Sequence, residues 1–251
     1  MFYPLGISRC WTNKMILKEE TKEQALEHAK RDSPRESVGL VYILKGREKY
    51  YECSNLAETP DEHFVLDPSD YLKCEEQGQI TGIIHSHPTT NHYPSAADLV
   101  ACEKSGLPWH VVNPETENWG YCEPSGYELP FVGRPFFHGV VDCYTLLQDF
   151  YKKEVNITMG DYHRRDKWWD KGENMYLDNF KKEGMREVDM DALKYGDILL
   201  MKLDSDVPNH GAIYLGEMII LHHVQGRLSS RDVYGGYYQK VTEVCLRHES
   251  R

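Results

Sequence analysis

The sequence lacks the features of several common protein classes. No apolar run approaches the about 18 residues that a membrane-spanning helix needs. Residues 1–6 have neither the basic nor the apolar region of a signal peptide. Acidic residues outnumber basic ones, 40 to 29, for a net charge of -11, which argues against bulk binding of nucleic acid or anionic membranes. We therefore expect a chain without a membrane span that is made and folds in the cytoplasm.

Cysteine is present, but not in a pattern that forms a framework. The seven cysteines are an odd number, and no two are spaced as Cys-x-x-Cys. This arrangement argues against a disulfide scaffold and against a cysteine-rich zinc knuckle. The sequence also has no internal repeat and no low-complexity tract. At 251 residues, it is long enough for one large or two small domains.

Two series of regular elements flank a Pro- and Gly-rich segment, which predicts a linker at residues 123–130. In residues 1–122 strands alternate with helices, which predicts an α/β domain layered on a central sheet. In residues 131–251 a helix from about 139 to 153 precedes adjacent strands, which predicts an α+β domain. Further helices are expected at 21–30, 69–77, 96–104 and 174–182. The expected strands are 38–44, 49–53, 80–84, 109–113, 197–203, 211–215, 219–224 and 241–247.

The most informative motif is His85-x-His87, which follows the apolar strand at 80–84. Side chains two positions apart on a strand point to one face, so both histidines can hold the same ion. With Asp98 on the next helix they supply three nitrogen or oxygen ligands, the number that a catalytic zinc uses. Ser95-x-x-Asp98 also matches a helix capping box, so a purely structural role for Asp98 stays open.

These residues belong to a larger pattern that includes a carboxylate upstream. Glu36 with Gly39-Leu40, then His85-Ser86-His87-Pro88 and Pro94-Ser95-x-x-Asp98, resembles the signature of the JAMM/MPN metalloprotease family over roughly residues 15 to 122. The resemblance implies an MPN-like fold with helices around a mixed sheet. It also implies one zinc ion held by His85, His87 and Asp98, with Glu36 as the base that acts on the zinc-bound water and Ser95 stabilising the tetrahedral intermediate.

A second group of reactive residues lies in the C-terminal half. Cys143 falls in the first turn of the helix expected from Gly139, where the helix dipole favours a thiolate. The strands that follow offer His210 and the pair His222-His223 as bases. A three-residue hairpin loop would place His222 on the face of His210, whereas a two-residue loop would place His223 there.

This half also matches a known pattern. Gly133-Arg134-Pro135-Phe136, Asp142-Cys143, Leu193-Lys194-x-Gly196-Asp197 and His210-Gly211 followed by Leu221-His222 resemble NlpC-type cysteine peptidases over about residues 130 to 248. The resemblance implies a papain-like fold, in which the nucleophile helix packs on an antiparallel sheet. Cys143 would be the nucleophile, His210 the base and His222 the residue that orients it. Phe131 stands where peptidoglycan-cleaving members have a tyrosine near the oxyanion site, which leaves the oxyanion donor unassigned.

The combination of both domains in one chain resembles tail assembly proteins of lambda-like bacteriophages, and residues 168–176 and 226–237 fit the same group. The resemblance implies two peptidase domains, phage tail-tip proteins as partners, and peptidoglycan stem peptides as the substrate of the C-terminal domain. The protein would be present in the host cytoplasm during assembly, or at the virion tail tip and act in the periplasm. Two alternatives stay open: a structural tail-tip adaptor with silent domains, and a cellular isopeptidase, which leaves Cys143 unexplained.

Overall fold

The computed structural model describes residues 17–251, and the chain divides into two compact units between Tyr127 and Glu128. The expectation for residues 1–6 lies outside the described part. Each unit has its own sheet and its own buried core. Within residues 17–251, no helix combines the length and the hydropathy that crossing a bilayer requires. The prediction of two domains of different fold class is confirmed.

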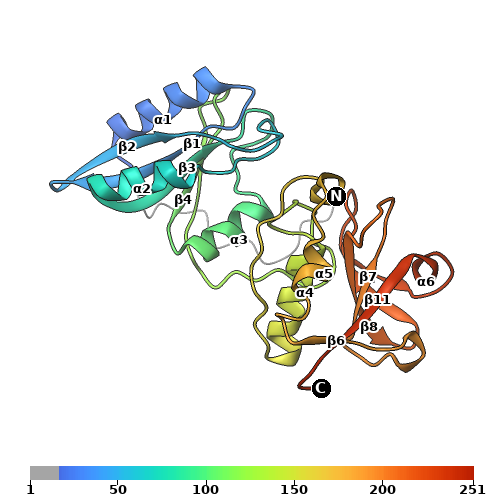
Figure 1. Cartoon of the computed structure of the whole chain (residues 1–251). Helices are drawn as coiled ribbons and strands as arrows, with labels where there is room; N and C mark the ends of the chain where they lie inside the picture. The colour runs from blue at the N-terminus through green and yellow to red at the C-terminus, as the bar shows by residue number, and fades with distance from the viewer. Residues whose placement is uncertain (1–16) are drawn as a thin grey trace. The chain divides into compact units, whose positions relative to one another are not determined.

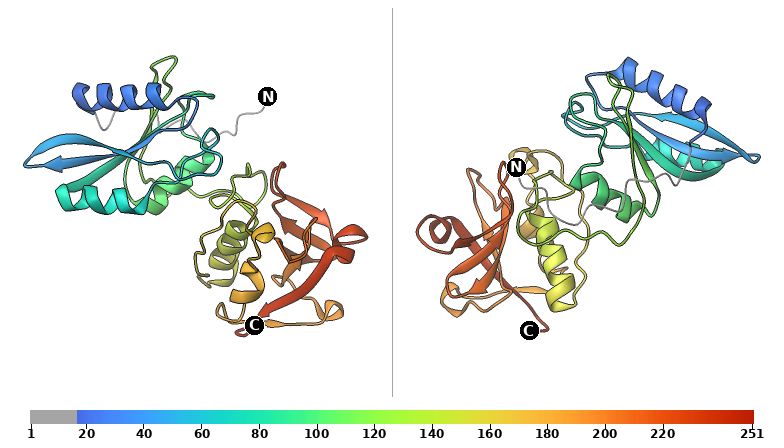
Figure 2. Two further views of the ribbon diagram at one scale, coloured as in Figure 1. Left: turned by 45° about the horizontal axis from the view of Figure 1, so that its top comes forward. Right: turned by 180° about the vertical axis from the view of Figure 1, so that it is seen from behind.

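The N-terminal unit is an α/β fold around one mixed sheet (Figure 1). The strand order is β2-β1-β3-β4-β5; β3 and β4 are parallel, and the other neighbours are antiparallel. Helices α1 and α2 lie on opposite faces of this sheet (Figures 1 and 2). The strands are β1 (Val38–Leu44), β2 (Arg47–Cys53), β3 (Gln79–Ser86), β4 (Trp109–Val112) and β5 (Trp119–Cys122), and the helices are α1 (Glu19–Asp32), α2 (Pro68–Gln77) and α3 (Ala96–Ser105).

The alternation of side chains along β3 decides what each face of this sheet carries. Ile84 points to one face, where it packs in a cluster with Ala25 of α1. Ile83 points to the other face, in a cluster with Cys74 of α2 and Cys102 of α3. Because His85 and His87 continue the alternation of Ile83, they lie on the face that α2 and α3 cover.

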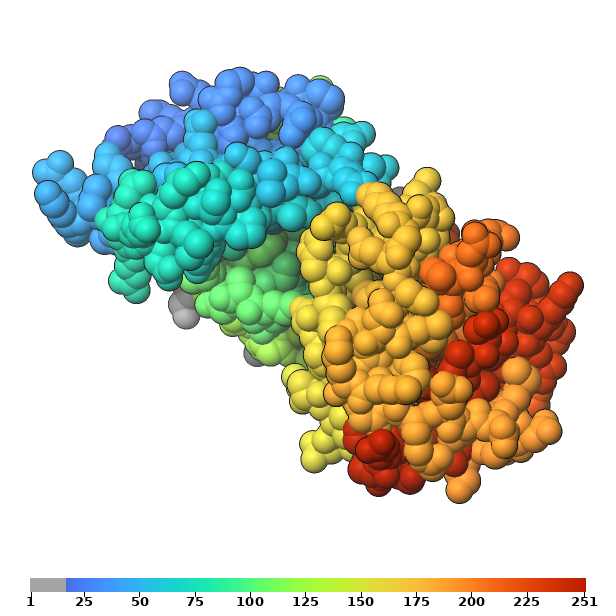
Figure 3. Space-filling view, in the orientation of Figure 1, coloured from blue at the N-terminus to red at the C-terminus, as the bar shows by residue number. Residues whose placement is uncertain are grey.

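The C-terminal unit is an α+β fold around an antiparallel sheet with strand order β10-β9-β8-β7-β11-β6. Helix α4 packs against β8, and its buried residues Leu146, Leu147 and Phe150 join Ile213 in the main core. On the face shown in Figure 3, the atoms of each unit form a continuous packed body. The strands are β6 (Met185–Glu187), β7 (Ile198–Met201), β8 (His210–Gly216), β9 (Ile219–His222), β10 (Ser230–Val233) and β11 (Thr242–His248); the helices are α4 (Cys143–Phe150), α5 (Met175–Asn179) and α6 (Tyr237–Val241), with short π or 3-10 segments at Tyr151–Val155, Trp168–Lys171 and Met190–Ala192.

Several element boundaries differ from the sequence prediction. Helix α4 begins at Cys143 and not near Gly139, because Asp142 caps it and the preceding residues form a bridge between Phe137 and Val141. The helix expected over 174–182 is limited to the five residues of α5. Strands β5, β6 and β10 were not predicted, because they lack the continuous apolar run that identifies the equally short strands β4, β7 and β9.

Gly39 in β1 provides a test of packing in the N-terminal unit. A Cβ atom at this position would lie 2.3 Å from the hydroxyl oxygen of Tyr50 and 2.4 Å from its Cζ atom. Tyr50 cannot move away easily, because its hydroxyl group pairs with Nδ1 of the buried His28 at 2.9 Å. We expect Gly39→Ala to destabilise this unit by about 1–3 kcal/mol through overpacking.

Urea denaturation of the full chain, followed by far-UV circular dichroism, measures this change. Gly235→Ala is the control, since a Cβ atom there has only one neighbour, Cγ1 of Val233, in ordinary contact at 3.8 Å. Equal unfolding midpoints for Gly39→Ala and the wild type would show that the Tyr50 ring yields without cost.

Candidate functional sites

Strand pairing between β1 and β3 places Glu36 beside the histidine motif. Val38 pairs with His85 in antiparallel register, and the Ser86 N–H donates to the Ser37 carbonyl at 3.0 Å. The same register extended by one residue sets Glu36 opposite His87, on the same face of the sheet. The Ser37 N–H also donates to Oγ of Ser86 at 2.8 Å. The serine between the two histidines therefore fixes the backbone that carries Glu36.

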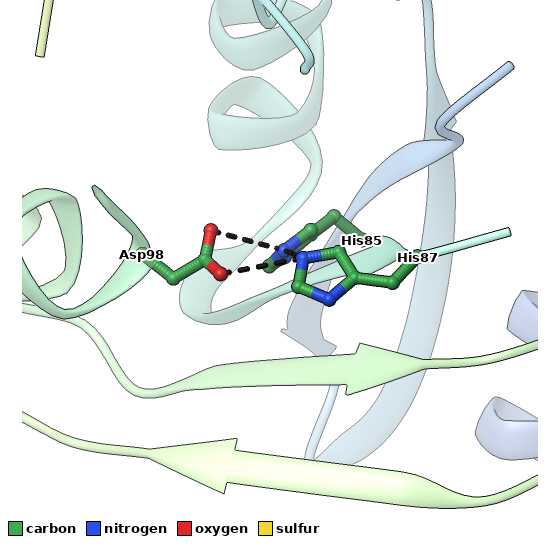
Figure 4. Close-up of side chains that lie close together, drawn as sticks. All are labelled: His85, His87 and Asp98. Carbon is green, nitrogen blue, oxygen red and sulfur yellow. Dashed lines mark hydrogen bonds and ion pairs between the residues drawn. The ribbon is translucent and has the colours of Figure 1, made fainter. Parts of the chain in front are cut away.

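The side chains of His85, His87 and Asp98, named here the His-Asp cluster, point toward one another (Figure 4). The two Nε2 atoms lie 3.1 Å apart. Oδ1 of Asp98 is 3.2 Å from Nε2 of His85, and Oδ2 is 3.3 Å from Nε2 of His87. All three residues are buried. The histidines come from the end of β3 and the carboxylate from the first turn of α3, as the sequence predicts.

Asp98 caps its helix and at the same time faces both histidines. The Ser95 N–H donates to Oδ2 of Asp98 at 2.6 Å, and the Asp98 N–H donates to Oγ of Ser95 at 3.1 Å, which is a complete capping box. The cap fixes the rotamer of Asp98, and its carboxylate faces both histidines. The two roles are therefore compatible, and the capping box orients the acidic member of the cluster.

The donor set of the His-Asp cluster fits a tetrahedral metal ion. Zinc binds imidazole nitrogen and carboxylate oxygen at about 2.0–2.1 Å, so neighbouring ligand atoms of a tetrahedron lie about 3.3–3.4 Å apart. The ligand distances of 3.1 to 3.3 Å are close to this value. Nδ1 of His87 lies 2.9 Å from the Asn91 carbonyl, to which it can only donate. A neutral His87 therefore directs the lone pair of Nε2 into the cluster.

The charges around the cluster are strongly coupled. Burial alone would raise the pKa of Asp98, but His85 and His87 hold it well below its usual range. Desolvation by burial raises the pKa of Glu36 to about 8; His87 acts in the opposite direction, and Asp98 raises the pKa further. Burial favours the neutral form of His85, whose ring packs against Phe64 and Trp109. Its Nδ1 atom has no hydrogen-bond partner among the described residues.

In the C-terminal unit, a buried ion pair fixes the start of the helix that carries Cys143. Oδ1 of Asp142 accepts from the Thr145 N–H at 2.9 Å, and the Thr145 hydroxyl accepts from the Asp142 N–H at 2.8 Å. Oδ2 of Asp142 accepts from Nε of Arg164 at 2.7 Å and from the Gly139 N–H at 2.9 Å. These contacts make Cys143 the first residue of α4.

The Cys143 thiol contacts groups from two other elements. Its Sγ atom is 3.3 Å from the Tyr176 hydroxyl oxygen of α5, and the Gly211 N–H of β8 also points to it. Burial raises the pKa of Cys143, and the neighbouring Asp142 raises it further; Tyr176, Gly211 and Arg164 act in the opposite direction. The resting thiol is therefore protonated, and the two hydrogen-bonding groups favour its ionised form.

His210 and His222 form a hydrogen-bonded pair, because a bulge corrects the register of their hairpin. The loop between β8 and β9 has two residues, 217 and 218, and loop length alone would have placed His223 beside His210. The register shifts between Tyr214 and Gly216, and the one extra residue in β8 brings His222 opposite Ala212. Nε2 of His210 then lies 3.2 Å from Nδ1 of His222. Burial, with the two neighbouring histidines, lowers the pKa of His210 to about 3, so this base is neutral at rest.

The other two residues that the sequence singled out, His223 and Phe131, form no hydrogen bond with Cys143, His210 or His222 in the described chain. His223 is buried against Phe136, and neither of its ring nitrogens has a hydrogen-bond partner in the described chain. Phe131 packs against Phe150, at the end of α4 farthest from Cys143. Two residues that the sequence did not indicate do contact these side chains: Tyr176 contacts the Cys143 thiol, and Asp232 lies 2.9 Å from Nε2 of His222. Tyr176 was noted only as part of segment 168–176, in which the buried Trp168 packs against its ring.

Comparison with known proteins agrees with this division into two sites. The family described as prokaryotic homologs of the JAB domain matches residues 18–121, and the NlpC/P60 family matches residues 133–247. The chain is 36% identical to tail tip assembly protein K of Escherichia phage N15, over 93% of this chain and 96% of that protein. The chain belongs to the tail tip assembly protein K family. It is 41% identical to the protein K of Escherichia phage lambda, over 74% of this chain and 90% of that protein. A JAB1/MPN domain protein from Archaeoglobus fulgidus aligns with a TM-score of 0.30 at 20% identity, over 44% of this chain and 89% of that one.

The contact between the Tyr176 hydroxyl and the Cys143 thiol predicts how the pKa of Cys143 responds to mutation. Tyr176→Phe removes one hydrogen-bond donor from the thiolate and should therefore raise the pKa of Cys143. We expect alkylation of Cys143 by iodoacetamide at neutral pH to slow by about tenfold, the equivalent of one pKa unit. Mass spectrometry of the peptide that contains Cys143 measures this rate as a function of pH.

Tyr144→Phe is the matched control, because Tyr144 packs against Tyr176 but donates its own hydroxyl group to the Gly160 carbonyl. It should leave the pH profile of Cys143 unchanged. Superimposable profiles for Tyr176→Phe and the wild type would mean that the phenol does not stabilise the thiolate.

Proposed function

We propose that this chain is a phage tail-tip assembly protein with two peptidase domains. The C-terminal domain is a cysteine endopeptidase that cleaves peptidoglycan stem peptides, and the N-terminal domain is a zinc-dependent peptidase or isopeptidase. The observation that carries the proposal is the hydrogen-bonded pair of His210 and His222 in the same unit as the buried Cys143 thiol, which the N–H of Gly211, the residue after His210, contacts, in a chain of the protein K family. A tail adaptor that only needed the fold would not require both a buried thiol at a helix start and a hydrogen-bonded pair of neutral histidines in one unit.

In the C-terminal domain, Cys143 attacks the carbonyl carbon of a peptide bond. His210 is neutral, so it can accept the thiol proton as the carbon–sulfur bond forms and can return it to the amine as the carbon–nitrogen bond breaks. Water then hydrolyses the thioester. The N–H of Cys143 lies at the start of α4, where backbone donors have no partner within the helix, and it would donate to the developing oxyanion.

In the N-terminal domain, His85, His87 and Asp98 would hold one zinc ion. When bound, zinc lowers the pKa of a water molecule to about 7 and polarises a substrate carbonyl. Glu36, opposite His87, would take and return the proton. The Ser95 hydroxyl accepts from the Asp98 N–H, which leaves its own proton to donate to the tetrahedral intermediate.

The proposed setting follows from the protein K family. The partners are phage tail-tip proteins, and the protein acts in the host cytoplasm during assembly or at the virion tail tip in the periplasm. Residues 123–130 are proposed as the linker between the domains at 1–122 and 131–251. Backbone N–H groups at Ser125 and Tyr127 donate to Glu103 in the N-terminal unit, whereas the carbonyl groups at Leu129 and Pro130 accept from Arg134 in the C-terminal unit.

Cleavage of muropeptides by the purified full chain tests the cysteine peptidase. The wild type should release stem-peptide fragments that chromatography with mass spectrometry identifies. Cys143→Ala should abolish cleavage, and His210→Ala should reduce it by about 10²–10⁴-fold, since it removes the general base. His163→Ala is the matched control, because His163 is exposed in the same unit and should not affect the rate. A silent wild type, with zinc and reductant supplied, would favour the structural adaptor.

Zinc content tests the N-terminal assignment. His87→Ala and Asp98→Ala should lower zinc from about one ion per chain to a small fraction, because each removes one of three ligands. Glu36→Gln should keep the zinc, since Glu36 is a base and not a ligand in this assignment. Inductively coupled plasma mass spectrometry of dialysed protein gives the stoichiometry.

His92→Ala is the control for the zinc experiment. His92 lies in the loop between β3 and α3, which follows His87, but it is not part of the His-Asp cluster. Equal zinc in the wild type and in His87→Ala would disprove the ligand assignment. Loss of zinc from Glu36→Gln would move Glu36 into the ligand set.

A further inference from the structure

Asp232 ends a line of side chains that leads away from the proposed base. It lies on the edge strand β10, which pairs with β9 so that Ser230 is opposite His222. Oδ2 of Asp232 is 2.9 Å from Nε2 of His222, and Nδ1 of His222 is 3.2 Å from Nε2 of His210. Neither the motifs nor the spacing in the sequence indicated this carboxylate.

The chemistry of these atoms fixes where the protons are. A carboxylate only accepts hydrogen bonds, so Nε2 of His222 must carry a hydrogen. A neutral imidazole has one such hydrogen, so Nδ1 of His222 is an acceptor, and Nε2 of His210 must donate to it. The second nitrogen of His210, Nδ1, is then left without a hydrogen.

Without Asp232 the opposite arrangement would also be possible. Nδ1 of His222 could carry the hydrogen and donate to Nε2 of His210. His210 would then hold its hydrogen on Nδ1 and could not accept a proton there. The hydrogen bond between the two rings forms in both arrangements, so it does not favour either tautomer. The contact with Asp232 favours the first arrangement, because it requires a hydrogen on Nε2 of His222.

We propose that Asp232 is a positioning residue that sets the tautomers of His222 and His210 and so keeps Nδ1 of His210 free to accept the proton of Cys143. This proposal rests on the cysteine peptidase function proposed above. Asp232 is itself held in place by Arg227 at 3.0 Å, Ser230 at 3.3 Å and the Tyr238 hydroxyl at 3.3 Å. These three donors satisfy the carboxylate and keep it directed at His222.

Histidine NMR spectra of the full chain labelled with nitrogen-15 test the proposal directly. Long-range proton–nitrogen correlations distinguish a hydrogen on Nε2 from one on Nδ1. The wild type should show both His222 and His210 with the hydrogen on Nε2. Asp232→Ala should move a measurable fraction of both rings to the Nδ1 form and should reduce cleavage by about 10²–10⁴-fold, the contribution of a positioned base.

Asp232→Asn is the conservative variant, because its amide oxygen can still accept from His222 in a side chain of the same size. It should keep both tautomers and recover most of the activity lost in Asp232→Ala. It should also lower the pKa of His222 below its wild-type value, since it removes the negative charge; the other groups that face this ring are Arg227, His210 and Tyr238. Asp191→Ala, at an exposed aspartate of the same unit, should change none of these signals.

Wild-type tautomers in a folded Asp232→Ala would overturn the proposal. If Asp232→Ala does not fold, an unchanged His222 titration in Asp232→Asn would overturn it instead. The tautomers are read without substrate, so an inactive wild type would contradict the peptidase function and leave this result interpretable.

Discussion

Strand register is the constraint on which both candidate sites depend. In the N-terminal unit, the pairing of Val38 with His85 sets Glu36 beside His87. In the C-terminal unit, one extra residue in β8 brings His222 to the face of His210. A shift of one residue in either pair would turn the functional side chain to the opposite face, because side chains alternate along a strand. The sheets therefore determine the chemistry as well as the stability of each unit.

Each site also uses an aspartate at the start of a helix, but the two carboxylates differ in what neutralises them. Asp142 at the start of α4 is paired with the buried guanidinium group of Arg164. Asp98 in the first turn of α3 faces the two histidines and accepts from the Ser95 N–H. In the first arrangement the charge of Asp142 is neutralised by Arg164, and the pair anchors the start of the helix. The second leaves negative charge and nitrogen lone pairs directed at one point, which is the requirement for holding a cation.

The sequence predicted those features that depend on local spacing. The two-residue interval of His85 and His87, the capping box at Asp98 and the position of Cys143 at a helix start all appear in the structure as expected, as does the fold class of both domains. The sequence did not predict the bulge in the β8–β9 hairpin, so it could not choose between His222 and His223 without the family pattern. Periodicity reports which face a residue occupies within its own strand, and not which residue of a neighbouring strand lies opposite.

The residues missed by the sequence reach their sites through tertiary contacts alone. Tyr176 is 33 positions from Cys143 and belongs to a five-residue helix. Asp232 is on a four-residue edge strand in a segment rich in glycine and tyrosine. Elements this short have little intrinsic preference for structure and form because of their packing, as the buried Trp168 ring against Tyr176 illustrates. Functional residues on such elements become visible only when the fold is known.

The two sites also differ in whether they are complete without an external group. The line from His210 to Asp232 ends at Arg227, and the chain itself supplies the donor in each of these three contacts. In the His-Asp cluster, by contrast, Nε2 of His87 and the carboxylate of Asp98 are both acceptors when His87 is neutral. Two acceptors at 3.3 Å repel unless a proton or a metal ion lies between them. Burial lowers the pKa of His87, but Asp98 raises it above its ordinary value, so a proton on Nε2 relieves this repulsion when no ion is bound. A divalent cation would instead use the lone pairs of all three residues. The chemistry proposed for the N-terminal domain would therefore need an ion from solution, whereas the chemistry proposed for the C-terminal domain would need only its own side chains.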